Sequence, residues 1–191
     1  MKLIFIRHGQ TNYNLKDLCN GRPNPRVRLT PLGLRQAAKA ARLLKNEQIE
    51  KIYTSKLFRS RQTALIINKY HKAPMHSDAR LNDRSMGIFE DMPAGLFYTW
   101  RDKQKNPWTC KPQGGESYES VKRRFKSFLT ELAKENKETI LIVTHLPILK
   151  IARGYFKHLS NKSMDSLTEK DIPNCTVFRF TIQNSKKKTK S

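Results

Sequence analysis

The stretch KLIFIRHGQTNYN, residues 2–14, decides the fold. Its four apolar residues, at positions 3–6, predict a short buried strand. The strand runs directly into Arg7, His8 and Gly9, and a cation or an imidazole is unfavourable in a protein interior unless it has polar partners. The stretch therefore predicts a buried strand whose carboxyl end opens into a polar site.

A second stretch, TILIVTH at residues 139–145, has the same form. It is nearly continuous in apolar and β-branched residues, which is typical of a central parallel strand. Further strands are predicted at residues 51–55 and 175–182, and helices are predicted in the intervening segments, at about 30–47, 56–70, 117–134 and 147–155. Strands that alternate with helices indicate an α/β protein. We expect a three-layer αβα sandwich with a mostly parallel central sheet and helices on both faces.

Two helix starts carry recognisable capping signals. Thr30 is a good N-cap, and Pro31 suits the first turn of the helix that follows it. Apolar residues recur with helical period after this start, which predicts a buried face made of Leu34, Ala37, Ala38, Ala41 and Leu44. Ser55 is expected to cap the next helix, KLFRSRQTALIINKY.

The 191 residues suffice for one sizeable core. We expect a single domain over residues 1–184 with a long functional flap at about 81–116, followed by a basic, disordered tail at 185–191. The apolar run near the start is too short for a signal peptide, and no segment approaches the ~18 apolar residues of a membrane span. Three scattered cysteines without a C-x-x-C favour neither a disulfide framework nor a zinc site, which indicates a cytoplasmic location.

The net charge is unusual for a chain of this size. Thirty-eight Lys and Arg residues face 16 Asp and Glu residues, which makes the formal net charge +22. Such a field attracts polyanions, including nucleic acid and phosphorylated metabolites, although no motif interleaves basic with aromatic residues. A solvated surface whose sign follows the composition of the host explains the charge equally well. If the charge serves function, it favours a substrate with several negative charges.

Polar residues follow the predicted strands at the point where ligands bind in open α/β sheets, beyond the carboxyl ends. His8 and His145 both follow buried strands, and adjacent strands would bring them together. The strand at 51–55 leads into a helix that carries Arg59 in its first turn. Arg7 and Arg59 offer planar sets of donors that match phosphoryl oxygens, and an imidazole among them can act as a nucleophile. The sequence thus predicts a site for a tetrahedral dianion.

Six blocks of the sequence resemble, in order, the histidine phosphatase superfamily with its phosphoglycerate mutase-like fold. They are RHGQTNYN (7–14), NGRPNPRVRLTPLGLRQA (20–37), YTSKLFRSRQTA (53–64), LNDRSMGIFE (81–90), GGES (114–117) and IVTH (142–145). One block would be a weak signal, whereas six in order are specific. The resemblance implies a phosphomonoesterase that acts on a small phosphorylated metabolite through a phosphohistidine, without a metal or another cofactor.

The resemblance also implies a role for each matched residue. His8 would attack phosphorus, and Asp83 would protonate the leaving oxygen. Arg7, Arg59 and His145 would complete the catalytic set by holding the phosphoryl group, with His145 either protonated or donating a hydrogen bond. Further substrate contacts are expected from Asn14, Asn20, Gly21 and Leu146.

Two departures from the family pattern bear on the reaction. The family often has Glu where this chain has Asp83, which shortens the side chain by one methylene. Between Asp83 and residues 114–117 the chain lacks the segment with which cofactor-dependent mutases close over bisphosphoglycerate. An enzyme that does not exclude water from phosphohistidine hydrolyses it. The missing segment therefore favours a phosphatase over a mutase.

Three alternatives stay open at this level. The first is phosphoryl transfer of the phosphoglycerate mutase type. The second is metal-assisted hydrolysis with His8, His145 and Asp83 as ligands, which two nearby arginines disfavour because they repel a divalent cation. The third is a non-catalytic binder of polyanions, either a phosphorylated partner or nucleic acid. The sequence leaves the oligomeric state open.

Overall fold

The computed structural model describes residues 1–182, and its centre is a five-stranded sheet. The strand order is β3-β2-β4-β1-β5; all neighbours pair in parallel except β5, which is antiparallel to β1. The strands are β1 (Lys2–Arg7), β2 (Lys51–Thr54), β3 (Met75–Ser77), β4 (Thr139–Thr144) and β5 (Val177–Thr181). The predicted α/β class with a mostly parallel sheet is confirmed.

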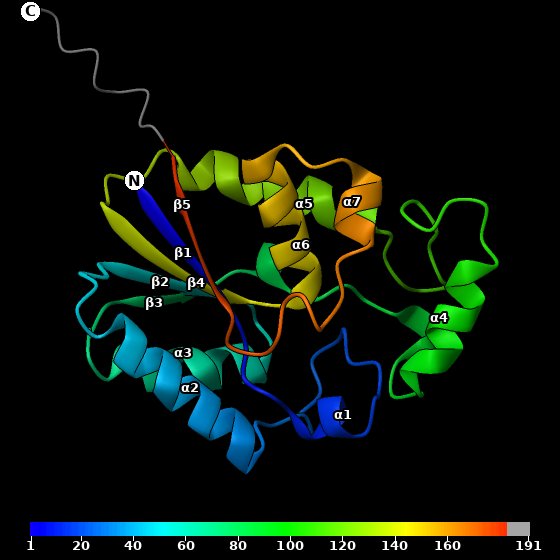
Figure 1. Ribbon diagram of the computed structural model, residues 1–191, viewed down its shortest axis with the longest axis horizontal. Coiled ribbons are helices and arrows are strands. Elements are labelled where there is room, and N and C mark those ends of the chain that lie inside the picture. The colour runs from blue at the N-terminus through cyan, green and yellow to red at the C-terminus, as the bar shows by residue number, and fades with distance from the viewer. Residues whose placement is uncertain (183–191) are drawn as a thin grey trace, which may run out of the picture.

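Helices cover both faces of the sheet (Figure 1). One face carries α2 (Pro31–Leu44) and α3 (Phe58–Asn68), and the other carries α5 (Tyr118–Leu132) and α6 (Leu146–Lys157). Since side chains alternate along a strand, β1 sends Ile4 and Ile6 into one core and Leu3 and Phe5 into the other. Burial on both sides explains the continuous apolar runs of the central strands.

The start of α2 agrees with the prediction, but its buried face does not. The Thr30 side chain accepts a hydrogen bond from the Gly33 N–H, as an N-cap should. The prediction that Leu34 and Ala38 belong to the buried face is wrong, because Leu34 is 44% exposed and Ala38 is half-buried. Gly33 is buried instead, against the loop that follows β1. A Cβ on Gly33 would lie 2.0 Å from the backbone oxygen of Gln10. The buried face is Gly33, Ala37, Ala40, Ala41 and Leu44.

The prediction that Ser55 caps the following helix is also wrong. α3 begins at Phe58, and its N-cap, Leu57, makes no side-chain capping bond. Ser55 Oγ instead accepts a hydrogen bond from the Leu57 N–H at 3.1 Å and lies 2.6 Å from Ser60 Oγ. This tight turn leaves Ser55 facing the end of the sheet and makes Arg59 the second residue of the helix.

The segment predicted as a flap, residues 81–116, contains regular structure that the sequence did not predict. Its longest element is α4 (Ala94–Asp102), whose Phe97 is buried with its ring 5.7 Å from that of Phe89. Figure 1 shows α4 and α1 beyond the end of the sheet at which β1 ends. The other unpredicted elements are too short to give a periodic pattern: α1 (Asn12–Leu15), η1 (Ala79–Leu81), η2 (Gly87–Phe89), β3 and α7 (Asn161–Asp165).

The register of the two central strands positions the site. Arg7 at the end of β1 pairs with Thr144 at the end of β4. The next residues, His8 and His145, therefore lie side by side at the same edge of the sheet, as the two strand ends predicted.

Three further sequence predictions concern the whole chain. Within residues 1–182, no helix has both the length and the apolar character that crossing a membrane requires. The basic tail predicted at 185–191 lies outside the described residues. The single-domain organisation over 1–184 stays a prediction.

Candidate active site

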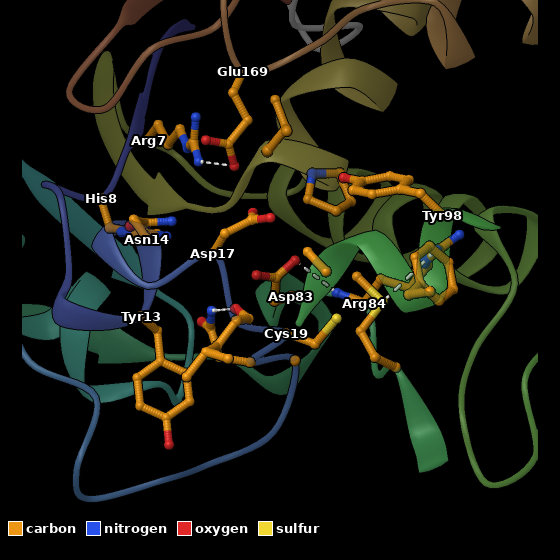
Figure 2. A pocket seen from close by; sticks show the side chains of 18 of the residues that line it. Arg7, His8, Tyr13, Asn14, Asp17, Cys19, Asp83, Arg84, Tyr98 and Glu169 are labelled. Atoms are coloured by element: carbon orange, nitrogen blue, oxygen red, sulfur yellow. Dashed lines mark hydrogen bonds and ion pairs between the residues drawn. The ribbon is translucent and has the colours of Figure 1, made fainter. Parts of the chain in front are cut away.

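A cavity of about 270 Å³ lies beyond the carboxyl ends of β1 and β4. Its wall contains Arg7, His8 and Asp83 of the predicted catalytic set (Figure 2). The two other members, Arg59 and His145, are fully buried and contact His8 and Asp83. The structure therefore brings all five predicted catalytic residues to one place.

His8 is held in one tautomer by the backbone. Its Nδ1 lies 2.8 Å from the carbonyl oxygen of Gly9, and since a carbonyl only accepts, the ring proton is on Nδ1. Nε2 is thus left with a lone pair, which accepts a hydrogen bond from Arg59 Nε at 3.2 Å. Burial, together with Arg59 and Arg7, lowers the pKa of His8 well below its usual value. The imidazole is neutral and can act as a nucleophile through Nε2.

His145 lies beside His8, with their ring centres 5.0 Å apart. Its Nδ1 is 3.5 Å from a carboxylate oxygen of Asp83, and its Nε2 is 2.8 Å from the hydroxyl oxygen of Ser55. The facing carboxylate favours a proton on Nδ1, which leaves Nε2 to accept a hydrogen bond from Ser55. Burial, followed by the charge of Arg59, lowers the pKa of His145 well below its usual value. Of the two predicted states, the geometry favours the neutral donor.

Arg59 connects three parts of the site. Besides the contact with His8, its Nη2 donates to the Asp83 carboxylate at 3.0 Å and to the carbonyl oxygen of Asn20 at 2.8 Å. Its position follows from the tight turn before α3, which directs the first turn of that helix at the end of β1. A planar guanidinium in this place can bind two oxygens of a phosphoryl group at once.

Arg7 is oriented by two contacts from one distant segment. Its Nη1 donates to the carbonyl oxygen of Ile172 at 2.7 Å, and its Nη2 donates to the carboxylate of Glu169 at 2.8 Å (Figure 2). The Glu169 side chain is 60% exposed, whereas that of Arg7 is 3% exposed. The accessible carboxylate of Glu169 thus accepts a hydrogen bond from Arg7 Nη2, a donor that an incoming phosphoryl group would need.

Asp83 lies in the cavity wall between the basic residues. Its carboxylate pairs with Arg59 at 3.0 Å and faces His145 at 3.5 Å, and the side chain is 17% exposed. It also accepts a hydrogen bond from the backbone N–H of Arg84 through its other oxygen. The carboxyl group is therefore rigidly positioned, and a phosphoryl group that binds Arg59 competes for its partner.

The residues predicted to add substrate contacts all line the cavity: Asn14, Asn20, Gly21 and Leu146. The side-chain oxygen Oδ1 of Asn14 accepts hydrogen bonds from the backbone N–H and the hydroxyl of Thr11. These bonds turn the side-chain NH₂ group of Asn14, which is a donor, away from Thr11. Asn20 acts on the site through its backbone, since its carbonyl oxygen accepts from Arg59.

Two glycines allow close backbone approaches next to the site. A Cβ on Gly21 would lie 2.0 Å from the backbone oxygen of Arg84, and one on Gly9 would lie 2.6 Å from that of Gly33. The Gly21 N–H donates to the carboxylate of Glu90 at 2.8 Å, and burial raises the pKa of Glu90. Glycine at these positions is explained by packing and not by a left-handed backbone.

Several residues of the site were not predicted from the sequence. Ser55 supports His145, and Thr63 accepts a hydrogen bond from the Gly9 N–H at 3.0 Å. Glu169 contacts Arg7, and Arg84 lines the cavity although it is 1% exposed. The signals for Ser55 and Thr63 were present, since both flank Arg59 in one block; Glu169 lies outside every recognised block.

The metal-assisted alternative needs a cluster of ligands. Among residues 1–182, no group of three or more His, Cys, Asp and Glu side chains is arranged to hold a metal ion. The three cysteines are free thiols in different parts of the fold.

Comparison with known families agrees with the site. The chain matches the histidine phosphatase superfamily (branch 1) over residues 3–191, and it belongs to that superfamily. Its curated relatives include several named as phosphatases, and with them the chain is an enzyme of the phosphatase class, a phosphoric monoester hydrolase. The resemblance seen in the six sequence blocks is confirmed.

Individual relatives include phosphatases of different names. The chain is 30% identical over 159 residues to the adenosylcobalamin/alpha-ribazole phosphatase of Salmonella typhimurium, which covers 79% of this chain and 77% of that protein. It is 36% identical over 137 residues to fructose-2,6-bisphosphatase TIGAR B of Danio rerio, but spans only 52% of that protein. The alpha-ribazole phosphatase structure from Shigella flexneri superposes with a TM-score of 0.82 at 24% identity, over 96% of this chain and 91% of that one. At this identity the structural likeness concerns the fold.

Proposed function

We propose that the enzyme hydrolyses small phosphorylated metabolites through a phosphohistidine on His8, without a metal ion. The observation that carries the proposal is the state of that imidazole. Its Nδ1–H is bound to the Gly9 carbonyl, so the Nε2 lone pair is available, and two buried guanidiniums lie around it. A neutral nucleophile next to Arg7 and Arg59 suits attack on a dianionic phosphoryl group.

In the first half-reaction, Nε2 of His8 attacks phosphorus and the ester P–O bond breaks. Arg7, Arg59 and the Nδ1–H of His145 bind the phosphoryl oxygens, where charge develops in the transition state. Binding of those oxygens to Arg59 draws it away from Asp83, and the carboxylate takes up a proton from solvent as the substrate binds. The Asp83 proton then passes to the leaving oxygen, and the alcohol departs.

In the second half-reaction, water attacks the phosphorus of the phosphohistidine. Asp83, now a carboxylate, accepts a proton from the water as the new P–O bond forms. The P–N bond breaks, and its electron pair returns to Nε2 of His8. Inorganic phosphate leaves, Asp83 releases its proton to solvent, and the ion pair between Asp83 and Arg59 forms again.

The volume of the cavity, about 270 Å³, suits a small metabolite more than a polymer. Asn14, Asn20, Gly21 and Leu146 form the part of the wall that would contact the alcohol portion of the substrate. A cytoplasmic location and association with nucleic acid or other polyanions stay predictions, resting on the cysteines and on the net charge of +22.

The direct test is to trap the phosphoenzyme. Wild-type protein is mixed with a ³²P-labelled phosphate ester in EDTA, quenched in alkali, and examined for an acid-labile, alkali-stable protein label. We expect label on wild type, no label on His8→Asn, and a fall in kcat of about a thousandfold or more in that variant. His158→Asn is the matched control, because His158 is exposed and has a left-handed backbone that asparagine tolerates.

Two results would contradict the proposal. One is full activity of His8→Asn on small esters. The other is loss of wild-type activity in EDTA with recovery on adding zinc, which would support metal-assisted hydrolysis instead.

A further inference from the structure

Arg84 is a buried cation that the proposed reaction does not use. It lines the cavity and is 1% exposed. Its guanidinium carbon lies 4.3 Å from the ring centre of Tyr118 and 4.5 Å from that of Phe97. Aromatic faces attract a cation, so the two rings hold the guanidinium in place. They do not neutralise its charge.

Most donors of Arg84 have no acceptor. Within residues 1–182, its Nε and Nη1 are buried without a hydrogen-bond partner, and its Nη2 faces the sulfur of Met86 at 3.7 Å. The neighbouring carboxylate, Asp83, is paired with Arg59 instead. An arginine remains charged in proteins, and a buried charge is unfavourable unless an opposite charge compensates it. Among residues 1–182, no carboxylate forms an ion pair with Arg84.

A second buried cation lies near the same tyrosine. Lys150 of α6 has its Nζ 3.5 Å from the Tyr118 hydroxyl and 3.2 Å from the backbone oxygen of Asp165. It lines an adjoining hollow, whose wall shares Tyr98, Leu146 and Glu169 with the catalytic cavity. Burial lowers the pKa of Lys150 to about 8, so the amine is still mainly charged near neutral pH.

Two acidic side chains lie on this side of the site, and one of them, Asp165, lines the same hollow as Lys150 with its Oδ1 buried and without a hydrogen-bond partner among residues 1–182. Asp165 faces Arg101 at 3.5 Å, and Glu169 is bound to Arg7. Arg84 and Lys150 thus form a pair of cations around Tyr118 for which the described part of the chain supplies no carboxylate at ion-pair distance. We refer to Arg84, Lys150 and Tyr118 as the second cationic cluster.

We propose that Arg84 binds a second anionic group of the substrate, a carboxylate or a phosphate, and that Lys150 strengthens the positive potential behind it. Figure 2 shows Arg84 across the pocket from His8, with Asp83 between them. The reacting phosphoryl group lies at His8, and the second anion lies at Arg84 in the same cavity. The proposal rests on the phosphatase function and adds the substrate class: small phosphomonoesters with two anionic ends.

Three matched esters with a three-carbon chain test this assignment. Propyl phosphate has no second anion, 3-phosphooxypropanoate has a carboxylate, and propane-1,3-diol bisphosphate has a second phosphate. We expect Arg84→Met to lower kcat/KM for at least one of the doubly anionic esters 10 to 100 times more than for propyl phosphate. The ester with the larger selective loss identifies the second group. Arg84→Lys, which keeps the charge without the planar fork, should fall between Arg84→Met and wild type.

Arg123→Met on α5 is the matched control, because Arg123 is exposed and its loss changes the net charge equally. Tm is measured for each variant to verify folding; replacing an unpaired buried charge with methionine should not lower it. Losses that are equal for the three esters overturn the proposal, as does an equal selective loss in Arg123→Met. If wild type forms no phosphohistidine, the proposed function fails; if it does and Arg84→Met changes no ester ratio, only the substrate class fails.

Discussion

An Arg59→Met variant should lose most of its phosphatase activity while keeping its fold. The methionine keeps an unbranched side chain but removes every donor of the guanidinium. The substitution removes three contacts of the guanidinium: the 3.2 Å hydrogen bond to His8 Nε2, the 3.0 Å ion pair with Asp83 and the 2.8 Å hydrogen bond to the Asn20 carbonyl oxygen. The nucleophile and the acid would then have no common cationic partner.

The magnitude follows from the number of bonds that Arg59 can make to the transferring group. Its Nε and Nη2 are the two donors directed at His8 and Asp83, so both are in position to bind phosphoryl oxygens. A hydrogen bond to a charged group contributes about 1.5–3 kcal/mol, and two therefore contribute about 3–6 kcal/mol. Since about 1.4 kcal/mol corresponds to a factor of ten, kcat/KM should fall roughly 10² to 10⁴-fold.

The assay is steady-state hydrolysis of a small phosphate ester in EDTA, with Tm measured on the same preparations. Arg61→Met is the control, because Arg61 lies two residues further along α3 and is exposed. It removes the same charge without touching the site. We expect its kcat/KM to remain within about threefold of wild type, the range left to long-range electrostatics.

Removing Arg59 also leaves Asp83 without its ion-pair partner, and an unpaired, largely buried carboxylate destabilises a protein. The double variant Arg59→Met/Asp83→Asn removes both charges and should recover Tm without recovering activity. If Arg59→Met retains kcat/KM within tenfold of wild type, or if the double variant regains activity along with Tm, the assignment of Arg59 to phosphoryl binding is wrong.

The remaining predictions concern substrate access and pH. Glu169→Gln should lower KM for phosphate esters by about 1.4- to fivefold with kcat unchanged, because an ion pair of about 0.2–1 kcal/mol, whose carboxylate is exposed, no longer competes for Arg7; an unchanged or higher KM would refute this competition. The free energy of unfolding should fall as pH drops below about 6.5, because His8 and His145 have lowered pKa values in the folded state and the unfolded chain binds more protons there. Urea titrations between pH 5 and 8 measure this slope; it should be shallower in His145→Gln, and equal slopes would contradict the attribution.

The elements that were predicted correctly are those whose environment is reflected in their own residues. β1 and β4 are buried on both faces, so their sequences are continuously apolar. The start of α2 was predictable because a cap depends only on nearby residues, here Thr30 and Gly33. The buried face of α2 was not, because the choice of Gly33 over Leu34 depends on how closely the Gln10 backbone approaches it.

The candidate site also has features that the sequence predicted and features that it did not. The meeting of His8 with His145 was predictable, since ligand sites in α/β sheets lie at the carboxyl ends of adjacent strands. The contact between Glu169 and Arg7 joins residues 162 positions apart through a loop without a recognisable pattern. Asp83 pairs with Arg59, which is distant in sequence, and its neighbour in sequence, Arg84, lies against two aromatic rings.

The sequence by itself determined that this is an α/β protein with a cationic, histidine-containing site at the ends of its central strands. The fold class and the position of the site follow from hydrophobic periodicity and strand order, which depend on short stretches of the chain. Only the tertiary structure decided which charges are compensated and which are not, because ion pairing and desolvation depend on distances between residues that the sequence keeps far apart. The lone pair on His8, the carboxylate on Arg7 and the unpaired guanidinium of Arg84 are all consequences of that packing.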